Sequence, residues 1–288
     1  MAYRIVKIGT RSKLETSLNY LVVRNDKETR ILLDDIQVLI IESQQICITS
    51  SLMTELMKHK VKVIFCDETH NPQGELIPYN SCYDTASKIR QQFKWKDEVK
   101  DKLWSEIVYR KIRNQAMVLS SLGCEEQNEL LNSYMTAIEP GDRTNREGLA
   151  AKVYFFGLFG HDFDRHDHDN PINAYLNYGY SLILGAVNRE ISAFGYLTQV
   201  GIHHIGETNP FNLGCDLMEP FRPFVDSMVV NNNLNQDNFK SQLLNVLTMK
   251  VVSNGRNTFL QNAIHDFVQS AFTALNSENV PVLYDVSF

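Results

Sequence analysis

The first 80 residues alternate between short apolar runs and turn-forming residues. The runs are rich in branched and aromatic side chains, which favour β-strands. Asn25-Asp26 supplies one of the turns between them. Ser50 and Ser51 then offer N-caps to a helix that contains Leu52. The pattern predicts a small β-domain with one helix packed on it, and the predicted strands are residues 3–8, 20–24, 29–33, 38–42, 45–49 and 61–66.

Apolar residues change to a helical spacing in the second part of the chain. Val99, Leu103 and Ile107 recur at intervals of four, which is the spacing of one helix face. Turn-rich sequence at 67–74 separates the two parts. We therefore expect a β-rich domain over residues 1–80, a linker over 81–87 and a helical domain over 88–288. Further helices are expected at 119–135, with a break at Gly123, and at 148–159, 173–194, 238–252 and 258–275.

Composition narrows the class of protein. Hydrophobic residues make up 43% of the chain, which is enough for a core. There is no run of about 18 apolar residues, and the N-terminus lacks the apolar stretch of a secretory signal. We therefore expect a cytoplasmic protein with no membrane contact. The five cysteines are scattered and show no Cys-x-x-Cys spacing, which favours reduced thiols over a zinc site.

The net charge of −6 hides a local basic segment. Residues 88–113 carry nine basic and four acidic side chains, a local excess of five positive charges. Such a strip can bind a DNA backbone even in an acidic chain, although a solvated helix face explains the charges equally well. The candidate DNA-binding residues are Lys88, Arg90, Lys94, Lys96, Arg110, Lys111 and Arg113.

Histidine and aspartate are densest at residues 161–169, which read His-Asp-Phe-Asp-Arg-His-Asp-His-Asp. These side chains suit many divalent ions, and with His265-Asp266 they are consistent with a His-Asp metal phosphohydrolase. The run follows a predicted helix and precedes Asn170-Pro171. In such loop composition, ligands would be poorly held. We therefore interpret the run as a solvated charged loop.

Two other segments place carboxylates at predicted helix starts. Glu147 stands three residues after Thr144, which is the spacing of a capping box. Asp216 and Glu219 share a helix face, where Asp216 could cap the helix and Glu219 could interact with its dipole. Arg222 could then be a simple ion-pair partner of Glu219. Capping alone would explain both segments.

These segments occur together in one order along the chain. Glu147 is followed by small residues, by a helix with Tyr-Gly-Tyr at its end (171–180), and by the paired His203 and His204 in a glycine-containing loop. Asp-Leu-Met-Glu-Pro-Phe-Arg-Pro follows at 216–223. Each piece is weak alone, but the ordered set resembles the signature of the CRISPR-associated integrase family. The likeness spans nearly the whole chain and is greatest to the type II-A subgroup.

The resemblance implies an α+β fold, in which a small β-sandwich-like domain with a helix precedes a larger all-α domain. It also implies that Glu147, His204 and Glu219 are catalytic ligands of Mg²⁺ or Mn²⁺. Many members have aspartate where Glu219 stands, but glutamate also binds divalent ions. The residues implied to orient these ligands or the phosphate are Asp216, Asn173, Tyr178 and Arg222.

By the same resemblance the chain is an integrase of CRISPR adaptation. The 3′-hydroxyls of prespacer DNA would attack the CRISPR repeat, in a metal-dependent transesterification that needs no protein nucleophile. The implied partners are double-stranded DNA, a second copy of the chain in a homodimer, a small companion subunit and further proteins of spacer acquisition. Two alternatives stay open. One is a non-catalytic nucleic-acid-binding scaffold of an acquisition complex, and the other is the His-Asp phosphohydrolase at residues 161–169.

Overall fold

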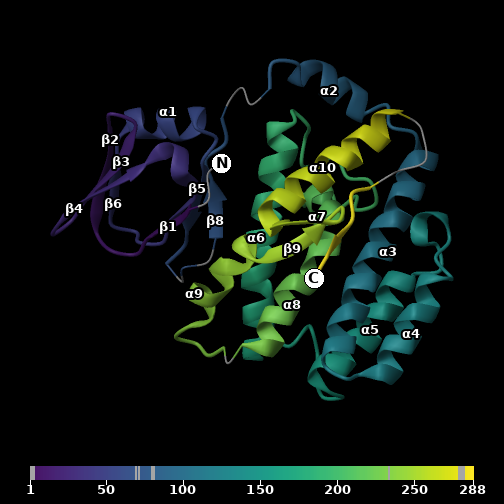
Figure 1. The fold of residues 1–288 in the computed structure, drawn as a ribbon. Helices are drawn as coiled ribbons and strands as arrows, with labels where there is room; N and C mark the ends of the chain where they lie inside the picture. The colour runs from purple at the N-terminus through teal and green to yellow at the C-terminus, as the bar shows by residue number, and fades with distance from the viewer. Residues whose placement is uncertain (1–3, 69, 71, 79–81, 233, 278–282) are drawn as a thin grey trace. The chain divides into compact units, whose positions relative to one another are not determined.

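Strand β5 (Ile36–Ile41) is buried at every position. Five of its six side chains are Ile, Leu or Val, and such a run is stable where both faces of the strand are covered. The structure is a computed structural model, and its internal contacts divide the chain into two units, Met1–Ser81 and Cys82–Phe288 (Figure 1). It describes residues 4–68, 70, 72–78, 82–232, 234–277 and 283–288.

Two sheets and one helix enclose the core of the first unit. The elements are β1 (Arg4–Ile8), β2 (Ser12–Ser17), β3 (Tyr20–Arg24), β4 (Glu28–Leu32), a 3₁₀-turn (Leu33–Asp35), β5, β6 (Ile46–Ile48), α1 (Ser50–Lys58), β7 (Lys62–Cys66) and β8 (Pro72–Glu75). Within the described residues, one sheet has the order β1-β5-β7-β8, with β1, β5 and β7 parallel. The other has the order β4-β3-β2-β6, and β2, β3 and β4 form an antiparallel meander. Leu21, Leu39 and Leu52, from both sheets and from α1, share one buried cluster.

The first unit contains two strands that the sequence did not predict, and a different residue caps its helix. β2 is largely polar, and it is a strand because it pairs with both β3 and β6. β8 lies in the segment expected to be a turn, and it pairs with the edge of β7. The hydroxyl of Thr49 caps α1 by accepting from the Leu52 amide at 3.3 Å, so the expected caps, Ser50 and Ser51, are wrong.

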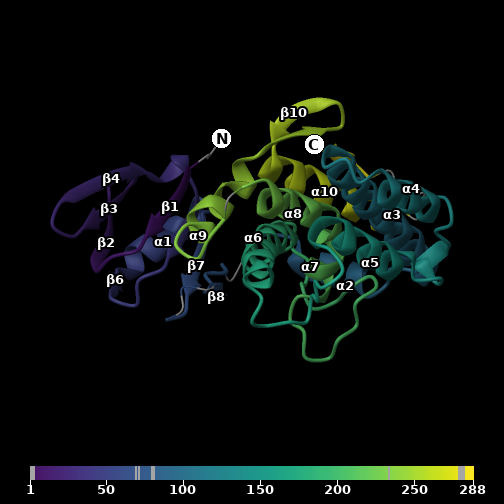
Figure 2. The same ribbon diagram turned by 90° about the horizontal axis from the view of Figure 1, so that it is seen from below.

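Helices dominate the second unit. They are α2 (Thr85–Gln92), α3 (Asp97–Ser121), α4 (Glu125–Met135), α5 (Arg146–Phe159), α6 (Pro171–Ala193), α7 (Asn212–Met218), α8 (Arg222–Asn231), α9 (Phe239–Leu243) and α10 (Leu260–Ser277), with 3₁₀-turns at Pro140–Asp142, Glu219–Phe221 and Leu244–Thr248. α3 packs against α4 and α5, and α6 packs against α7, α8 and α10 (Figures 1 and 2). α2 begins inside the segment that the sequence assigns to a linker. None of the described helices is long and apolar enough to cross a membrane.

The expectation of an all-α second domain is wrong. Among the described residues this unit also contains a three-stranded antiparallel sheet of order β10-β9-β11. β9 (Lys250–Ser253) and β10 (Arg256–Phe259) form a hairpin around Asn254-Gly255, where both residues have positive φ, and β11 (Val286–Ser287) pairs with β9. An Asn-Gly pair is a strong signal for such a turn. The helix predicted at 238–252 therefore extends too far.

Close packing of α6 on α8 depends on Gly179. A Cβ atom added at Gly179 would lie 2.3 Å from Val225 Cγ1, which is far inside van der Waals contact. Val225 is the fourth residue of α8, three residues after Arg222. The glycine in the middle of α6 thus fixes the place where α8 begins.

Gly179→Ala should destabilise the protein although alanine is the better helix former. The clash with Val225 should cost about 1–3 kcal/mol, against a gain of up to about 1 kcal/mol in helix propensity. Denaturant unfolding measures the net loss. Ser181→Ala, on the same helix, is the control and should change the unfolding free energy by less than about 0.5 kcal/mol. Equal or greater stability of Gly179→Ala would show that α6 and α8 can move apart at no cost.

Candidate active site

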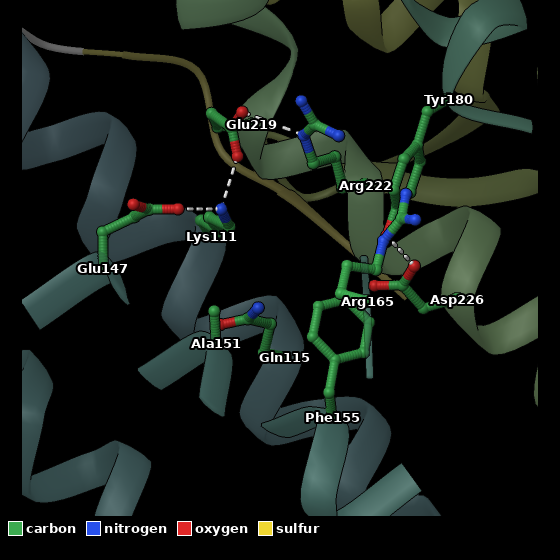
Figure 3. A pocket seen from close by; sticks show the side chains of 10 residues that line it. All are labelled: Lys111, Gln115, Glu147, Ala151, Phe155, Arg165, Tyr180, Glu219, Arg222 and Asp226. Carbon is green, nitrogen blue, oxygen red and sulfur yellow. Dashed lines mark hydrogen bonds and ion pairs between the residues drawn. The ribbon is translucent and has the colours of Figure 1, made fainter. Parts of the chain in front are cut away.

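One face of α3 carries the residues around which the candidate site is built. Trp104, Lys111 and Gln115 stand seven and then four residues apart, so they share one face of the helix, and all three are buried. A buried ammonium needs a negative partner, because it is costly to remove from water. Lys111 has two such partners. Its Nζ donates to Glu147 Oε1 and, at 2.5 Å, to Glu219 Oε2 (Figure 3).

Glu147 stands in the first turn of α5, but its side chain does not cap the helix. The N-cap is Asn145, whose side chain accepts from a first-turn amide at 3.1 Å. The carboxylate of Asp142 accepts from the amides of the first two helical residues at 2.8 and 2.9 Å. The capping box expected between Thr144 and Glu147 is therefore wrong. Other side chains satisfy the helix start, which leaves the Glu147 carboxylate to face Lys111.

Glu219 is buried in the 3₁₀-turn that joins α7 to α8. Its carboxylate oxygens have different partners: Oε2 accepts from Lys111, and Oε1 accepts from Arg222 Nε at 2.9 Å. Burial raises the pKa of Glu219, but the charges of Arg222 and Lys111 outweigh it and bring the pKa down to about 2. Burial lowers the pKa of Lys111, and the charges of Glu219 and Glu147 more than restore it. Both Glu219 and Lys111 are therefore charged at neutral pH.

The buried carboxylate of Asp216 orients His204. Asp216 lies inside α7 and not at its N-cap, so the capping role expected as an alternative is wrong. Its Oδ1 binds His204 Nδ1 at 2.6 Å and accepts from the His204 amide at 3.0 Å. Its Oδ2 accepts from the amides of Ile202 and His203 at 2.6 and 3.1 Å. One carboxylate thus shapes the whole loop and engages Nδ1, so Nε2 is the ring nitrogen available to a ligand.

Trp104 packs against both histidines of this loop. Its ring stacks on His203 with centroids 4.2 Å apart and meets His204 edge-on at 5.8 Å. The hydrogen bond to Asp216 raises the pKa of His204 and outweighs the effect of burial, and the charges of the two glutamates of the site raise it further. The His204 ring therefore lies within the electrostatic influence of both carboxylates that face Lys111.

A cavity of about 220 Å³ lies beside the two glutamates (Figure 3). Three basic and three acidic side chains line it, so its formal charge is zero. Tyr180 Oη donates to Asp226 Oδ1 at 2.5 Å, and burial raises the pKa of Asp226 to about 6. The lining residues are Lys111, Gln115, Glu147, Ala151, Phe155, Arg165, Tyr180, Glu219, Arg222 and Asp226.

Asn173 and Tyr178, which the resemblance expects to orient the ligands or the phosphate, contact other parts of the unit. Asn173 holds the loop at 161–169, because its Nδ2 donates to two backbone carbonyls of that loop at 2.8 Å each. Tyr178 packs its ring on Phe239, with centroids 5.7 Å apart. Neither residue lines the cavity, and their expected role in orienting the ligands or the phosphate stays a prediction.

Several residues of the cavity were not expected from the sequence. Lys111 carried a signal, because it continues the apolar stripe of Leu103 and Ile107 at a four-residue interval. A charged residue in such a stripe must find a buried partner. Gln115 continues the same stripe. The sequence offers no comparable signal for the other unexpected polar lining residues, which are Arg165, Tyr180 and Asp226.

The basic segment at 88–113 does not form one surface. Lys111 is buried in the candidate site, which corrects its assignment to DNA binding. Arg110 and Arg113 each bind a carboxylate at 2.5 Å and donate to backbone carbonyls near the C-terminus at 3.0 and 2.9 Å. They hold the C-terminal segment on α3. Of the other candidates, Lys88 pairs with Asp84 at 3.1 Å, while Arg90, Lys94 and Lys96 are exposed.

The part of the chain that the structure describes contains no group of three His, Cys, Asp or Glu side chains already placed to hold a metal ion. In the loop at 161–169 all histidines and aspartates are exposed. His265 binds Glu190 at 2.7 Å and has no part in that loop. The alternative of a His-Asp phosphohydrolase thus has no ligand cluster in the described residues.

The comparison with known proteins agrees with the resemblance. A family model described as CRISPR associated protein Cas1 matches residues 8–263. The chain belongs to the Cas1 family. The CRISPR-associated endonuclease Cas1 of Neisseria meningitidis serogroup C (strain 8013) is 35% identical over 232 residues, which cover 80% of this chain and 76% of that protein. A CRISPR-associated endonuclease Cas1 of Pyrobaculum aerophilum is 28% identical over 204 residues, or 64% of this chain and 67% of that protein.

Solved structures extend the likeness to 97% of this Cas1 family chain. A casposase bound to integration product has a TM-score of 0.74 at 20% identity, and the match covers 92% of it. A Cas6-RT-Cas1–Cas2 complex has a TM-score of 0.73 at 18% identity, and the match covers 36% of that chain. At these identities the two structures show a shared fold.

Asp216→Asn should lower the pKa of His204. The hydrogen bond to Asp216 is the largest cause of the raised pKa, and asparagine keeps the shape of the side chain without its charge. An NMR titration of the His204 ring measures the change. His265 is the internal control, because Glu190 raises its pKa at a separate place and this pKa should not move. A His204 pKa that stays raised would assign the effect to Glu147 and Glu219.

The same pair should give the stability a pH dependence. The folded-state pKa of His204 lies above its unfolded value of about 6.5. The pair therefore stabilises the fold fully below about pH 6.5, and this contribution disappears as the pH rises through the folded-state pKa. Asp216→Asn should flatten the fall of melting temperature over this window.

Proposed function

We propose that the chain joins prespacer DNA to a CRISPR repeat by metal-dependent transesterification, with Glu147, His204 and Glu219 as ligands of the ion. Membership of the Cas1 family makes it a CRISPR-associated DNA endonuclease and integrase. One observation carries the choice of site. Glu147 and Glu219 come from different helical segments and converge on one buried cation, Lys111.

The residues present fit a divalent ion. Glu147 and Glu219 share one cation, the Lys111 ammonium, which supports this place for an ion, and the charges of both carboxylates raise the pKa of His204. Two carboxylates and an imidazole suit Mg²⁺ or Mn²⁺, and the imidazole favours Mn²⁺. When bound, the ion would activate the attacking 3′-hydroxyl and offset charge on the phosphate.

Neighbouring side chains hold these ligands in place. Asp216 engages His204 Nδ1, so the ring presents Nε2. Arg222 binds Glu219 and lies 4.6 Å from the centroid of the Tyr180 ring, which limits its movement. The three basic and three acidic side chains of the cavity cancel formally, so with a divalent ion bound the cavity is formally +2. This charge favours the entry of a phosphodiester.

Double-stranded DNA, a second copy of the chain and a small companion subunit are the proposed partners. Solved structures of the same fold include a casposase bound to integration product and a complex that contains Cas1 and Cas2. In this proposal the exposed Arg90, Lys94 and Lys96 contribute to backbone binding. Arg110 and Arg113 do not, because they hold the C-terminal segment. The type II-A subgroup and the choice of metal stay predictions.

Removing a ligand should abolish integration and spare DNA binding. Glu147→Ala and His204→Ala should each lose at least about a hundredfold in integration rate. Glu219 is tested as Glu219→Gln, because glutamine removes the charge but keeps the volume and an oxygen that can accept from Lys111 or Arg222, whereas alanine would leave a cavity. The measurement is integration into a supercoiled CRISPR plasmid with and without Mn²⁺, beside a thermal melt and a DNA titration. Normal integration by Glu147→Ala would favour the non-catalytic scaffold.

Lys111→Met should make the stability of the protein depend on an added cation. Without the ammonium, Glu219 keeps only Arg222 and Glu147 loses the cation that faces it, which should cost about 3–5 kcal/mol of unfolding free energy in EDTA. Mn²⁺ should then raise the melting temperature more in Lys111→Met than in the wild type. Lys102→Met, at an exposed position of the same helix, is the control. An equal response to Mn²⁺ in all three proteins would contradict a shared cation site.

A further inference from the structure

The loop at residues 161–169 is folded onto α6. Asn173 Nδ2 donates to the backbone carbonyls of Asp164 and Asp167 at 2.8 Å each. The carboxylates of the same two aspartates accept from amides two residues further along, at 2.9 and 3.0 Å. These bonds fix the backbone on both sides of Arg165.

Arg165 is the basic side chain that this loop contributes to the cavity. The histidines and aspartates around it are exposed, whereas Arg165 is half-buried. It lines the same cavity as Glu147 and Glu219, and its guanidinium lies 5.5 Å from the centroid of the Tyr180 ring (Figure 3). The loop therefore reaches the candidate active site through a single side chain.

The charge of Arg165 is held by neutral groups. Its Nη1 donates to Asn173 Oδ1 at 3.1 Å, and its Nη2 donates to Asn177 Oδ1 at 2.6 Å. Within the described residues it forms no ion pair with a carboxylate. The other two basic residues of the cavity both pair with Glu219. Arg165 is thus the cavity cation whose charge is not already neutralised by a direct partner.

Its hydrogen-bonding capacity also exceeds what the protein uses. A guanidinium has five N–H donors, and the two asparagines take two of them. The remaining donors suit the planar, bidentate recognition of phosphate oxygens. The third carboxylate of the cavity, Asp226, is engaged by Tyr180 at 2.5 Å. A phosphate beside Glu147 and Glu219 would be repelled by these carboxylates, and the charge of the Arg165 guanidinium, which lines the same cavity, offsets that repulsion.

We propose that Arg165 binds a phosphate of the DNA strand that enters the cavity, and so positions the reacting nucleotide beside Glu147 and Glu219. The inference rests on the proposed function, since it takes the same cavity as the place of strand transfer. Arg165 contacts substrate in this proposal, and Asn173 and Asn177 aim its guanidinium. The exposed histidines and aspartates of the loop have no part in the contact.

The first test compares Arg165→Gln and Arg165→Lys with the wild type in single-turnover integration. Arg165→Gln should slow integration by about 10- to 100-fold, because it loses a charge-assisted contact. Arg165→Lys should recover part of the rate, since lysine keeps the positive charge but cannot donate two parallel hydrogen bonds to one phosphate. Arg143→Gln is the matched control, because the Arg143 side chain is 74% exposed, and it should integrate like the wild type. Wild-type rates in Arg165→Gln would overturn the proposal.

The second test locates the phosphate. Single phosphates near the joining site are replaced by neutral methylphosphonates, one substrate at a time. In the wild type, one position should slow integration about 10-fold or more, and Arg165→Gln should be insensitive at that same position. If the rate losses caused by Arg165→Gln and by the methylphosphonate multiply at every position, the two changes act independently, and this result would rule out the contact. If Arg165→Gln melts early, the same scan in Arg165→Lys decides between the two outcomes.

Glu147→Ala, run in the same assay, separates this inference from the function on which it rests. Loss of integration in Glu147→Ala together with normal integration in Arg165→Gln would remove the phosphate contact and leave the proposed function intact. Normal integration in Glu147→Ala would remove both. Loss of integration in both Glu147→Ala and Arg165→Gln, together with one phosphate position to which Arg165→Gln is insensitive, supports both the phosphate contact and the proposed function.

Discussion

Three charges from three separate stretches of the chain meet in the interior of the second unit, where the ammonium of Lys111 lies between Glu147 and Glu219. Lys111 and Glu219 are buried, and a buried charge costs several kcal/mol to remove from water unless opposite charges compensate it. The long helix α3, the start of α5 and the turn between α7 and α8 are therefore bound to one arrangement. Helix packing brings these segments together, and charge compensation determines how closely.

Two other buried carboxylates near this centre accept hydrogen bonds from backbone amides. Asp142 takes two amides at the start of α5, and Asp216 takes three amides and a ring nitrogen in the loop before α7. Asp142 thereby leaves the Glu147 carboxylate to face Lys111, and Asp216 holds the His204 ring so that its Nε2 is available to a ligand.

The order of short motifs along the chain was enough to predict the family, the mixed α and β content and the choice of Glu147, His204 and Glu219 as candidates. The sequence could not predict Arg165 in the cavity, because its place depends on bonds between a loop and the side of α6. Counting charges also misled, since Lys111 was grouped with surface residues although it stands in an apolar stripe. The sequence did not predict strand β2 either, because its residues are largely polar and it is a strand only through pairing with β3 and β6.

The contact between Trp104 and the two histidines gives the molecule an optical reporter. Of the two tryptophans in the chain, Trp95 lies against Tyr196, while Trp104 stacks on His203 and meets His204 edge-on. A protonated imidazole quenches indole emission more strongly than a neutral one. The intrinsic fluorescence of Trp104 will therefore change with the protonation of its neighbours and with any shift of their loop, so that events at the loop of His203 and His204 can be followed in real time without a label.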